Sequence, residues 1–532
     1  MKTAPVPARL QPAAAIQPLH AGRHLARLLT IAAILARYDA AFPLERVNGA
    51  RWLVPFVRLF SRRDKGLRGL RPGQRLARAL QVMGPAFIKL GQALSTRADL
   101  IGEEMANDLS QLQDRLPPFP SRDARAAIER ELGKPIEELY SAFEDEPVAA
   151  ASIAQVHFAR TLEGEGVAVK VLRPGIAAAM ARDLDLFTWL AQLAERWQPN
   201  LRRLKPVAVV DTMRESVRIE MDLRLEAAAA DELRQNFEGD PGFRVPRVDW
   251  ARTARNVLTL ERVGGIRVDD REGLLSAGFD LRELLTRAAA NFFYQVFRDG
   301  FFHADLHPGN LFIDQDGALV AVDFGIMGRL DRATRFYLAD MLVAFLNRDY
   351  RRVAEVHFEA GYVPVEQSLD AFAQAARAIG EPIFGRPLQD ISLGRLLAQL
   401  FQVTQQFQME TQPQLLLLQK TMVLVEGMGR QLDPTINIWL LARPLVEEWM
   451  RFNRGPEARL KEVFVQSAEL LGRLPVTLRR AEDLLVTITD EGGIPLHPEA
   501  LEAMARRGAI AILGLPLWIA ALALVAIAIA LW

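Results

Sequence analysis

The sequence contains no cysteine among its 532 residues. That absence excludes disulfide bonds, thiolate catalysis, and zinc or iron–sulfur centres held by cysteine, and it is compatible with a reducing compartment and with export alike. The chain also has no net charge, because 65 Lys and Arg balance 65 Asp and Glu. Since 50% of its residues are hydrophobic, it is not a disordered protein. Its length allows a large core spread over about two to four domain-sized units.

The balance of charge is uneven along the chain. Residues 1–90 carry 16 Lys and Arg but only 3 Asp and Glu, and the densest basic stretch, 51–78, is interleaved with apolar residues. Such a mixture favours an anionic membrane surface, where each basic residue contributes about 1 kcal/mol. The alternatives are nucleic acid, which no sequence motif supports, and a solvated helix face.

A long hydrophobic run ends the chain. Residues 509–532 are uncharged, and as a helix rising about 1.5 Å per residue they would reach roughly 36 Å, enough for a ~30 Å hydrocarbon core. Arg506 and Arg507 precede the run, so the positive-inside rule places the body of the protein on the cytoplasmic side. We expect a transmembrane segment here, with a buried or re-entrant hairpin as the alternative. Leu25–Ala36 predicts an amphipathic helix rather than a signal peptide.

Four polar residues stand in the order found in protein-kinase-like nucleotide sites. Lys170 lies in a β-branched stretch that predicts a strand, Asp305 and Asn310 lie in one loop, and Asp323 opens Asp-Phe-Gly. In such sites the lysine pairs with phosphates, the loop Asp orients a nucleophile, and the Asn and the second Asp hold Mg²⁺. We therefore predict a site for ATP or ADP with Mg²⁺, with Lys170 and Asp305 as catalytic residues and Asn310 and Asp323 as metal ligands. The alternative is four unrelated polar residues in a helical protein.

Two signatures of protein kinases are missing. Where a glycine-rich loop would precede the lysine strand, the chain has Ala149, Ala150, Ala151 and Ser152. Alanine restricts the approach of backbone amides to phosphate, so we expect these residues to bind nucleotide with differently posed phosphates. After Asp323, residues 326–330 run directly into a helical pattern without Ala-Pro-Glu. The missing activation segment argues against ordinary protein substrates.

Lys170 requires a carboxylate partner, and the helix expected over 206–237 offers three. Glu220 and Asp222 are two residues apart and would point to different helix faces. We prefer Glu226, because the alanines that follow it suggest a buried position. A solvated helix face is the alternative for each of the three acids.

Two histidines of the catalytic-loop sequence invite a metal interpretation. His303 and His307 are four residues apart, as zinc ligands on a helix can be. Pro308 makes this segment a loop, and Asp305 and Asn310 already account for it. We therefore predict one or two Mg²⁺ ions at the kinase-like site and no histidine-bound metal.

The overall pattern predicts an α+β, protein-kinase-like two-lobed fold with a helical N-terminal extension, a largely helical C-lobe and a C-terminal transmembrane helix. Short strands are expected at 257–260, 311–313 and 318–322, and the Ser121 hydroxyl is expected to cap a helix. The expected domains are a tail with an amphipathic helix, a helical extension, an N-lobe, a C-lobe and a membrane segment, over 1–50, 51–140, 141–265, 266–505 and 509–532.

With these features and the segment Lys89-Leu90-Gly91-Gln92, the chain resembles the UbiB family of atypical kinases, bacterial relatives of the mitochondrial coenzyme Q kinases. Lys89–Gln92 matches the KxGQ motif of the family, Ala149–Ser152 its alanine-rich loop, and Glu220–Asp222 its ExD motif. The resemblance implies that the KxGQ segment folds over the active site, where a protein substrate would lie. Lys89 and Gln92 would then face the nucleotide pocket and, with Glu220 and Asp222, regulate it.

The resemblance also implies an ATPase or small-molecule kinase that supports ubiquinone biosynthesis at the cytoplasmic face of the bacterial inner membrane. The expected partners are anionic membrane lipid and quinone-biosynthesis intermediates or enzymes, with a homodimer left open and no nucleic acid. The chain departs from the family at Ala229, where Asn is common, and in having room for one terminal span rather than two. A nucleotide-dependent, non-catalytic scaffold is the main alternative, and a conventional protein kinase is the other.

Overall fold

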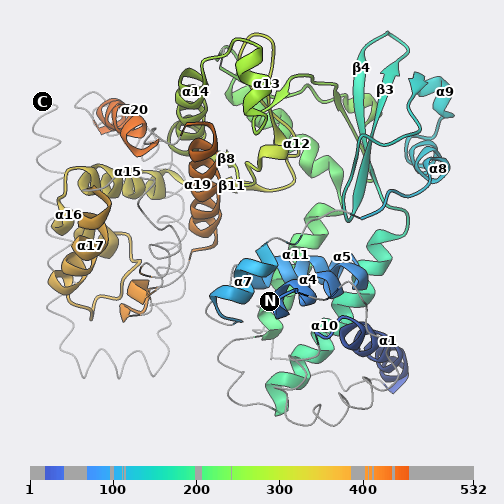
Figure 1. The fold of residues 1–532 in the computed structure, drawn as a ribbon, viewed down its shortest axis with the longest axis horizontal. Helices are drawn as coiled ribbons and strands as arrows, with labels where there is room; N and C mark the ends of the chain where they lie inside the picture. Colours follow the sequence, from blue (N-terminus) through green and yellow to red (C-terminus); the bar gives the residue numbers. More distant parts are fainter. Residues whose placement is uncertain are drawn as a thin grey trace, which may run out of the picture. The chain divides into compact units, whose positions relative to one another are not determined.

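The chain divides into two compact units, Met1–Glu447 and Glu448–Trp532. Figure 1 shows the elements coloured along the sequence. The computed structural model describes residues 18–40, 67, 69–95, 101–110, 112, 116–197, 206–240, 242–384, 399, 402–404, 406–409, 412–433 and 438–454. All of the elements discussed below lie in the first unit, apart from the end of the last helix.

The amino-terminal part is helical, as expected. Its helices are α1 (Pro18–Arg37), α4 (Pro72–Met83), α5 (Pro85–Ser95) and α7 (Glu103–Ser110). Helices α4, α5 and α7 pack against one another, and α1 packs against α4. The packing is close at Gly91, where an added Cβ would lie 2.5 Å from Leu112 Cδ1 and 2.8 Å from Leu80 Cδ1. The glycine of the KxGQ segment is therefore required by the contact of α5 with its neighbours.

A five-stranded antiparallel sheet follows. Its order is β1 (Tyr140–Phe143), β3 (Ala154–Thr161), β4 (Gly166–Leu172) and β6 (Val257–Glu261), with β2 (Ala149–Ala150) beside β3. The valines of β4 alternate into the core, so Lys170 points to the opposite face of the sheet. The strands expected around Lys170 and at 257–260 are confirmed.

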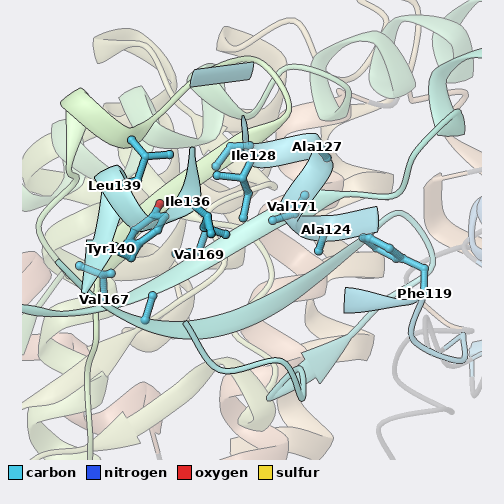
Figure 2. Packing of buried hydrophobic residues seen from close by; sticks show 12 residues of the cluster. Phe119, Ala124, Ala127, Ile128, Ile136, Leu139, Tyr140, Val167, Val169 and Val171 are labelled. Carbon is cyan, nitrogen blue, oxygen red and sulfur yellow. The ribbon is translucent and has the colours of Figure 1, made fainter. Parts of the chain in front are cut away.

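Helices α8 (Ser121–Leu132) and α9 (Ile136–Leu139) cover the core face of this sheet. Figure 2 shows Ala124 and Ile128 of α8 packed toward Val169 and Val171 of β4. Burial of each such valine or isoleucine contributes roughly 1.5–3 kcal/mol, which fixes the strand that carries Lys170. The expected cap at Ser121 is wrong, because Pro120 occupies the N-cap position and no side chain caps the helix.

Three helices connect the sheet to the rest of the fold: α10 (Ile176–Trp197), α11 (Pro206–Glu220) and α12 (Leu223–Asn236). The single helix expected over 206–237 is wrong, because the chain breaks at Met221 and Asp222. The Asp222 carboxylate accepts a hydrogen bond from the backbone N–H of Arg224 and so starts a new helix. Glu220 and Glu226, which were predicted to lie on one helix, therefore lie on the separate helices α11 and α12.

The following part combines short strands with helices. A four-stranded sheet has the order β5 (Phe243–Arg244), β10 (Leu319–Ala321), β9 (Leu311–Ile313) and β7 (Ile266–Arg267), and β8 (Phe301–His303) pairs with β11 (Met327–Arg329). Helix α13 (Arg271–Ser276) precedes α14 (Leu281–Phe293), which continues as a π-helical turn over Tyr294–Asp299. The expected strands at 311–313 and 318–322 are confirmed, whereas the direct passage from Gly325 into a helix is wrong because β11 intervenes.

The last described helices are α15 (Arg332–Leu346), α16 (Tyr350–Glu359), α17 (Leu369–Phe384), α19 (Pro413–Leu432) and α20 (Ile438–Arg454). Helix α16 packs against α15 and α17, around a core of Ala354, Val363, Phe372 and Phe407. Among the helices that the structure describes, none is long and apolar enough to cross a membrane. The transmembrane segment expected at 509–532 lies outside the described residues, as does most of the basic stretch 51–78.

Candidate active site

The site is organised by Lys170, which projects from the middle of β4. Its Nζ donates to Glu226 Oε1 and to Asp323 Oδ1, each at 2.8 Å. Glu226 lies in the first turn of α12, where the positive end of the helix dipole favours a carboxylate. The expected pairing of Lys170 with Glu226 is present, and the same lysine also holds the acid of Asp-Phe-Gly.

The Lys170 ammonium group thus pairs with two carboxylates, and these contacts determine the protonation of all three side chains. Burial opposes the charged form of Lys170, but Asp323 and Glu226 outweigh it and raise the lysine's pKa. The attraction of Lys170 holds the pKa of Asp323 well below its usual range. Burial raises the pKa of Glu226 to about 7 against the pull of Lys170, with a further contribution from Asp323. Lys170 and Asp323 are therefore charged at neutral pH, while burial shifts the pKa of Glu226 upward toward neutral pH.

The backbone at Asp323 has an unusual conformation. Its φ of 65° lies in the left-handed region, which non-glycine residues rarely adopt. The neighbouring Phe324 is 1% exposed and packs near the His303 ring, and the N–H of Val322 donates to Asn310 O at 2.9 Å. These contacts hold the strained residue so that its carboxylate meets Lys170.

The loop after β8 positions Asp305 and Asn310. The N–H of Asp305 donates to His303 Nδ1 at 3.1 Å, and Nδ2 of Asn310 donates to the backbone oxygen of Asp305 at 3.3 Å. Burial lowers the pKa of His303, so this ring is neutral. His307 accepts the N–H of Gly309 and caps a short 3₁₀ turn. Both histidines therefore shape the loop.

Asn310 and Asp323 are chemically suited to Mg²⁺, which prefers hard oxygen ligands supplied by one or two carboxylates. The Asp323 carboxylate is anionic and about half exposed, with a side-chain exposure of 51%. The amide nitrogen of Asn310 faces the backbone of its own loop, so the amide oxygen is the atom that a cation would use. No group of three or more His, Cys, Asp or Glu suited to a metal occurs in the part of the chain that the structure describes.

The alanine-rich loop forms a tight turn ahead of the lysine strand. Ala149 and Ala150 pair with β3, and the N–H of Ala151 donates to Ala154 O at 2.8 Å. Ser152 is buried, and its Oγ has no hydrogen-bond partner. An unsatisfied buried hydroxyl costs about 1–3 kcal/mol, and a bound polar group would recover this energy.

The KxGQ segment reaches one acid of the ExD segment. Lys89 Nζ of α5 donates to Glu220 Oε1 at the end of α11 at 2.9 Å, and both side chains are largely buried. Asp222 is instead paired with Arg224 and caps α12. Gln92 lies half-buried on α5, where the Ser95 hydroxyl donates to its backbone oxygen. The structure thus joins Lys89 to Glu220 but does not bring Asp222 into the same contact.

One residue near Asp305 was not anticipated from the sequence. Lys420 of α19 places its Nζ 2.8 Å from Asp305 Oδ1. The two residues are 115 positions apart, and Lys420 belongs to no motif with a stated chemistry. No signal in the sequence could have found it.

Two family models match this chain. Residues 111–357 match the ABC1 atypical kinase-like domain, and residues 376–437 match the UbiB helical domain. A mycobacterial structure, the complex of Rv3197 with erythromycin from Mycobacterium tuberculosis, is 26% identical and covers 68% of this chain and 93% of that one, with a TM-score of 0.48.

Curated relatives align over most of the chain. A protein of Marinobacter nauticus is 43% identical over 91% of this chain and 89% of its own length. Proteins of Azotobacter vinelandii and Pseudomonas fluorescens are 44% and 45% identical over 86% of this chain. All three are named probable protein kinase UbiB. With its kinase-like domain, its helical domain and these relatives, the chain belongs to the UbiB family of atypical kinase-like proteins.

Proposed function

We propose that this protein binds Mg·ATP and acts as an atypical kinase or ATPase that supports ubiquinone biosynthesis. The observation that carries the proposal is the pairing of Lys170 with both Glu226 and Asp323, in the same domain as Asp305 and Asn310. A strand lysine paired with a helix glutamate, beside an Asp-Phe-Gly acid that can hold Mg²⁺, is the arrangement that phosphoryl transfer uses.

Each residue has a defined part in this proposal. Lys170 would exchange a carboxylate for nucleotide phosphate while Glu226 keeps its ammonium group in place. Asp323 and Asn310 would supply oxygen ligands to Mg²⁺. Asp305 would orient the hydroxyl group or the water that accepts the phosphoryl group. Bound Mg·ATP supplies the phosphoryl group itself.

Two features support a substrate other than an ordinary protein. Only the short strand β11 and a turn separate Gly325 from α15, so no long segment on which a peptide could rest lies between Asp-Phe-Gly and that helix. The KxGQ helix is also fixed to α11 by Lys89 and Glu220. A small molecule, a lipid or water is therefore the proposed acceptor.

The proposed location is the cytoplasmic face of the bacterial inner membrane. The uncharged run 509–532 would anchor the chain, and the basic and apolar residues of 51–78 would meet anionic lipid. The proposed partners are quinone-biosynthesis intermediates or enzymes. This part of the proposal depends on the sequence and on membership of the family.

A second candidate is a scaffold that binds nucleotide without turning it over. It is favoured by one observation: both acids required for chemistry, Asp305 and Asp323, are paired with lysines in this structure. In this case nucleotide would only change the conformation of the protein.

Ubiquinone and its precursors, measured by mass spectrometry in a strain that lacks the gene, test both candidates. The strain is complemented with wild type, with Asp323→Asn, or with Asp370→Asn, a control that alters an exposed ion pair with Arg351. Rescue by wild type and the control but not by Asp323→Asn supports the enzyme. Equal rescue by all three supports the scaffold, and normal ubiquinone in the deletion strain removes the pathway.

A further inference from the structure

The contact between Lys420 and Asp305 involves the catalytic-loop acid of the proposed site and has no part in the proposed function. Lys420 Nζ lies 2.8 Å from Asp305 Oδ1, with side-chain exposures of 43% and 31%. The ammonium group is therefore accessible from solvent while it touches the acid expected to orient the acceptor.

Helix α19 holds Lys420 in a defined position. It packs against α14 and β11, the elements on either side of the catalytic loop in the sequence. One face of the helix is buried through Leu418, Thr421, Val425, Met428 and Leu432. At its end, Arg271 Nε donates to the backbone oxygen of Leu432 at 3.3 Å. Lys420 thus reaches the loop from a helix that is packed against the domain.

The charge balance suggests a role for this lysine. Lys170 is shared between two carboxylates, and Lys89 contacts Glu220. The catalytic-loop sequence 303–310 contains no Lys or Arg. Phosphoryl-transfer sites place cations around the transferred group, and a lysine ammonium group is a compact partner for phosphate oxygens. Lys420 brings such a cation to Asp305 from outside the loop.

A surface ion pair that only stabilises the fold is the competing explanation. Pairs this exposed contribute about 0–1 kcal/mol to stability. A pair that only stabilises the fold does not contact nucleotide, so its removal should change the affinities for a triphosphate and a diphosphate equally. A difference between triphosphate and diphosphate is therefore the property that separates the two explanations.

We propose that Lys420 binds the terminal phosphate of a nucleoside triphosphate beside Asp305, so that the helical domain completes the phosphate site. The inference rests on the proposed function and deepens it, because it names a phosphate-binding residue for the same site. In the protein without nucleotide, the Lys420 ammonium group is paired with Asp305, and the terminal phosphate would take the place of that carboxylate.

The test compares two nucleotides on the full-length protein in detergent. Dissociation constants are measured by calorimetry for AMP-PNP, a non-hydrolysable triphosphate, and for ADP, both with Mg²⁺. Lys420→Met is expected to raise the dissociation constant of AMP-PNP about tenfold and that of ADP less than about twofold. Lys420→Arg keeps the positive charge and is expected to retain most of the affinity for AMP-PNP. Arg351→Met, which removes an exposed 2.8 Å ion pair with Asp370, is the matched control and should change neither constant.

A second background separates phosphate binding from an action through Asp305. In Asp305→Asn the effect of Lys420→Met on AMP-PNP should persist, because the phosphate rather than the acid is the partner. Loss of the effect in this background overturns the inference. If Lys420→Met does not fold, Lys420→Gln is used instead, and the ratio of its AMP-PNP and ADP dissociation constants tests the inference in the same way.

The failures of the two proposals are distinguishable. If wild type binds both nucleotides and the Lys420 variants leave their ratio unchanged, only the role of Lys420 is overturned. If wild type binds neither nucleotide, the proposed function falls and this inference falls with it.

Discussion

Replacement of Lys170 by methionine should destabilise the protein, because it removes the only positive charge that we find paired with Glu226 and Asp323 among the described residues. Lys170 and Glu226 have side-chain exposures of 18% and 7%, so the change leaves a buried carboxylate without its cation. Removing one partner of a buried pair costs about 3–5 kcal/mol. Asp323 is half exposed and Glu226 can take up a proton, and both reduce the cost of the change. We therefore expect the free energy of unfolding to fall by about 3 kcal/mol at pH 8, the lower end of that range.

The loss should depend on pH in a defined direction. In wild type the pKa of Glu226 is raised from 4.5 to about 7, so its contribution to stability is full below pH 4.5 and is lost as the pH rises to 7. Without Lys170 the pKa rises further, and the folded variant keeps its proton above pH 7. The stability deficit of Lys170→Met should therefore grow by about 1 kcal/mol between pH 7 and pH 8.

Urea denaturation at pH 6, 7 and 8 measures this deficit. Glu226→Gln is the matched control, because it keeps the shape of the side chain and leaves Lys170 with Asp323. It should cost less than about 1 kcal/mol and abolish the Glu226 contribution to the pH dependence. A Lys170→Met protein as stable as wild type, or one with the same deficit at pH 6 and pH 8, would refute the account of the charges.

Three further predictions concern packing, capping and the KxGQ contact. Gly91→Ala should destabilise the protein by about 1–3 kcal/mol in thermal denaturation, because its Cβ would overlap neighbouring leucine side chains. Gly427→Ala on α19, where nothing lies within 4 Å of an added Cβ, should instead stabilise it by about 0.5–1 kcal/mol, and the opposite order would contradict the packing described for α5. Asp222→Ala should cost about 1 kcal/mol in urea denaturation through the loss of the α12 cap, and an unchanged midpoint would count against the helix break. Lys89→Met should speed amide hydrogen exchange in α5 while Lys134→Met, an exposed control outside the site, should not; equal exchange in both would remove the role of Lys89 in fixing this helix.

The sequence was sufficient where a single local segment carries its own signature. The β-branched residues around Lys170 predicted β4, and the order of the polar residues placed Lys170 and Asp323 in one site, where they are in contact. The alanines after Glu226 correctly indicated a buried partner for the lysine. In each of these cases a short segment carries a recognisable signature, although the segments themselves are 56 and 153 residues apart.

It was insufficient where an interaction across the fold, or a competing local contact, decides the structure. The break at Met221 and Asp222 lies within a pattern suited to one long helix, and capping by an acid overrides that pattern. The strand β11 forms because β8 offers it a partner. Lys420 reaches Asp305 only through the packing of α19, which has no counterpart in local sequence.

The lysine shared between Glu226 and Asp323 also determines how metal and nucleotide affect each other's binding under the proposed function. A divalent cation that arrives alone has to displace an ammonium group from Asp323. A nucleotide that accompanies the cation offers phosphate oxygens to the displaced ammonium group. Binding of the two is then cooperative, and by linkage each raises the affinity of the protein for the other by the same factor. Free Mg²⁺ would be a poor ligand, and the site would load only when both components are present.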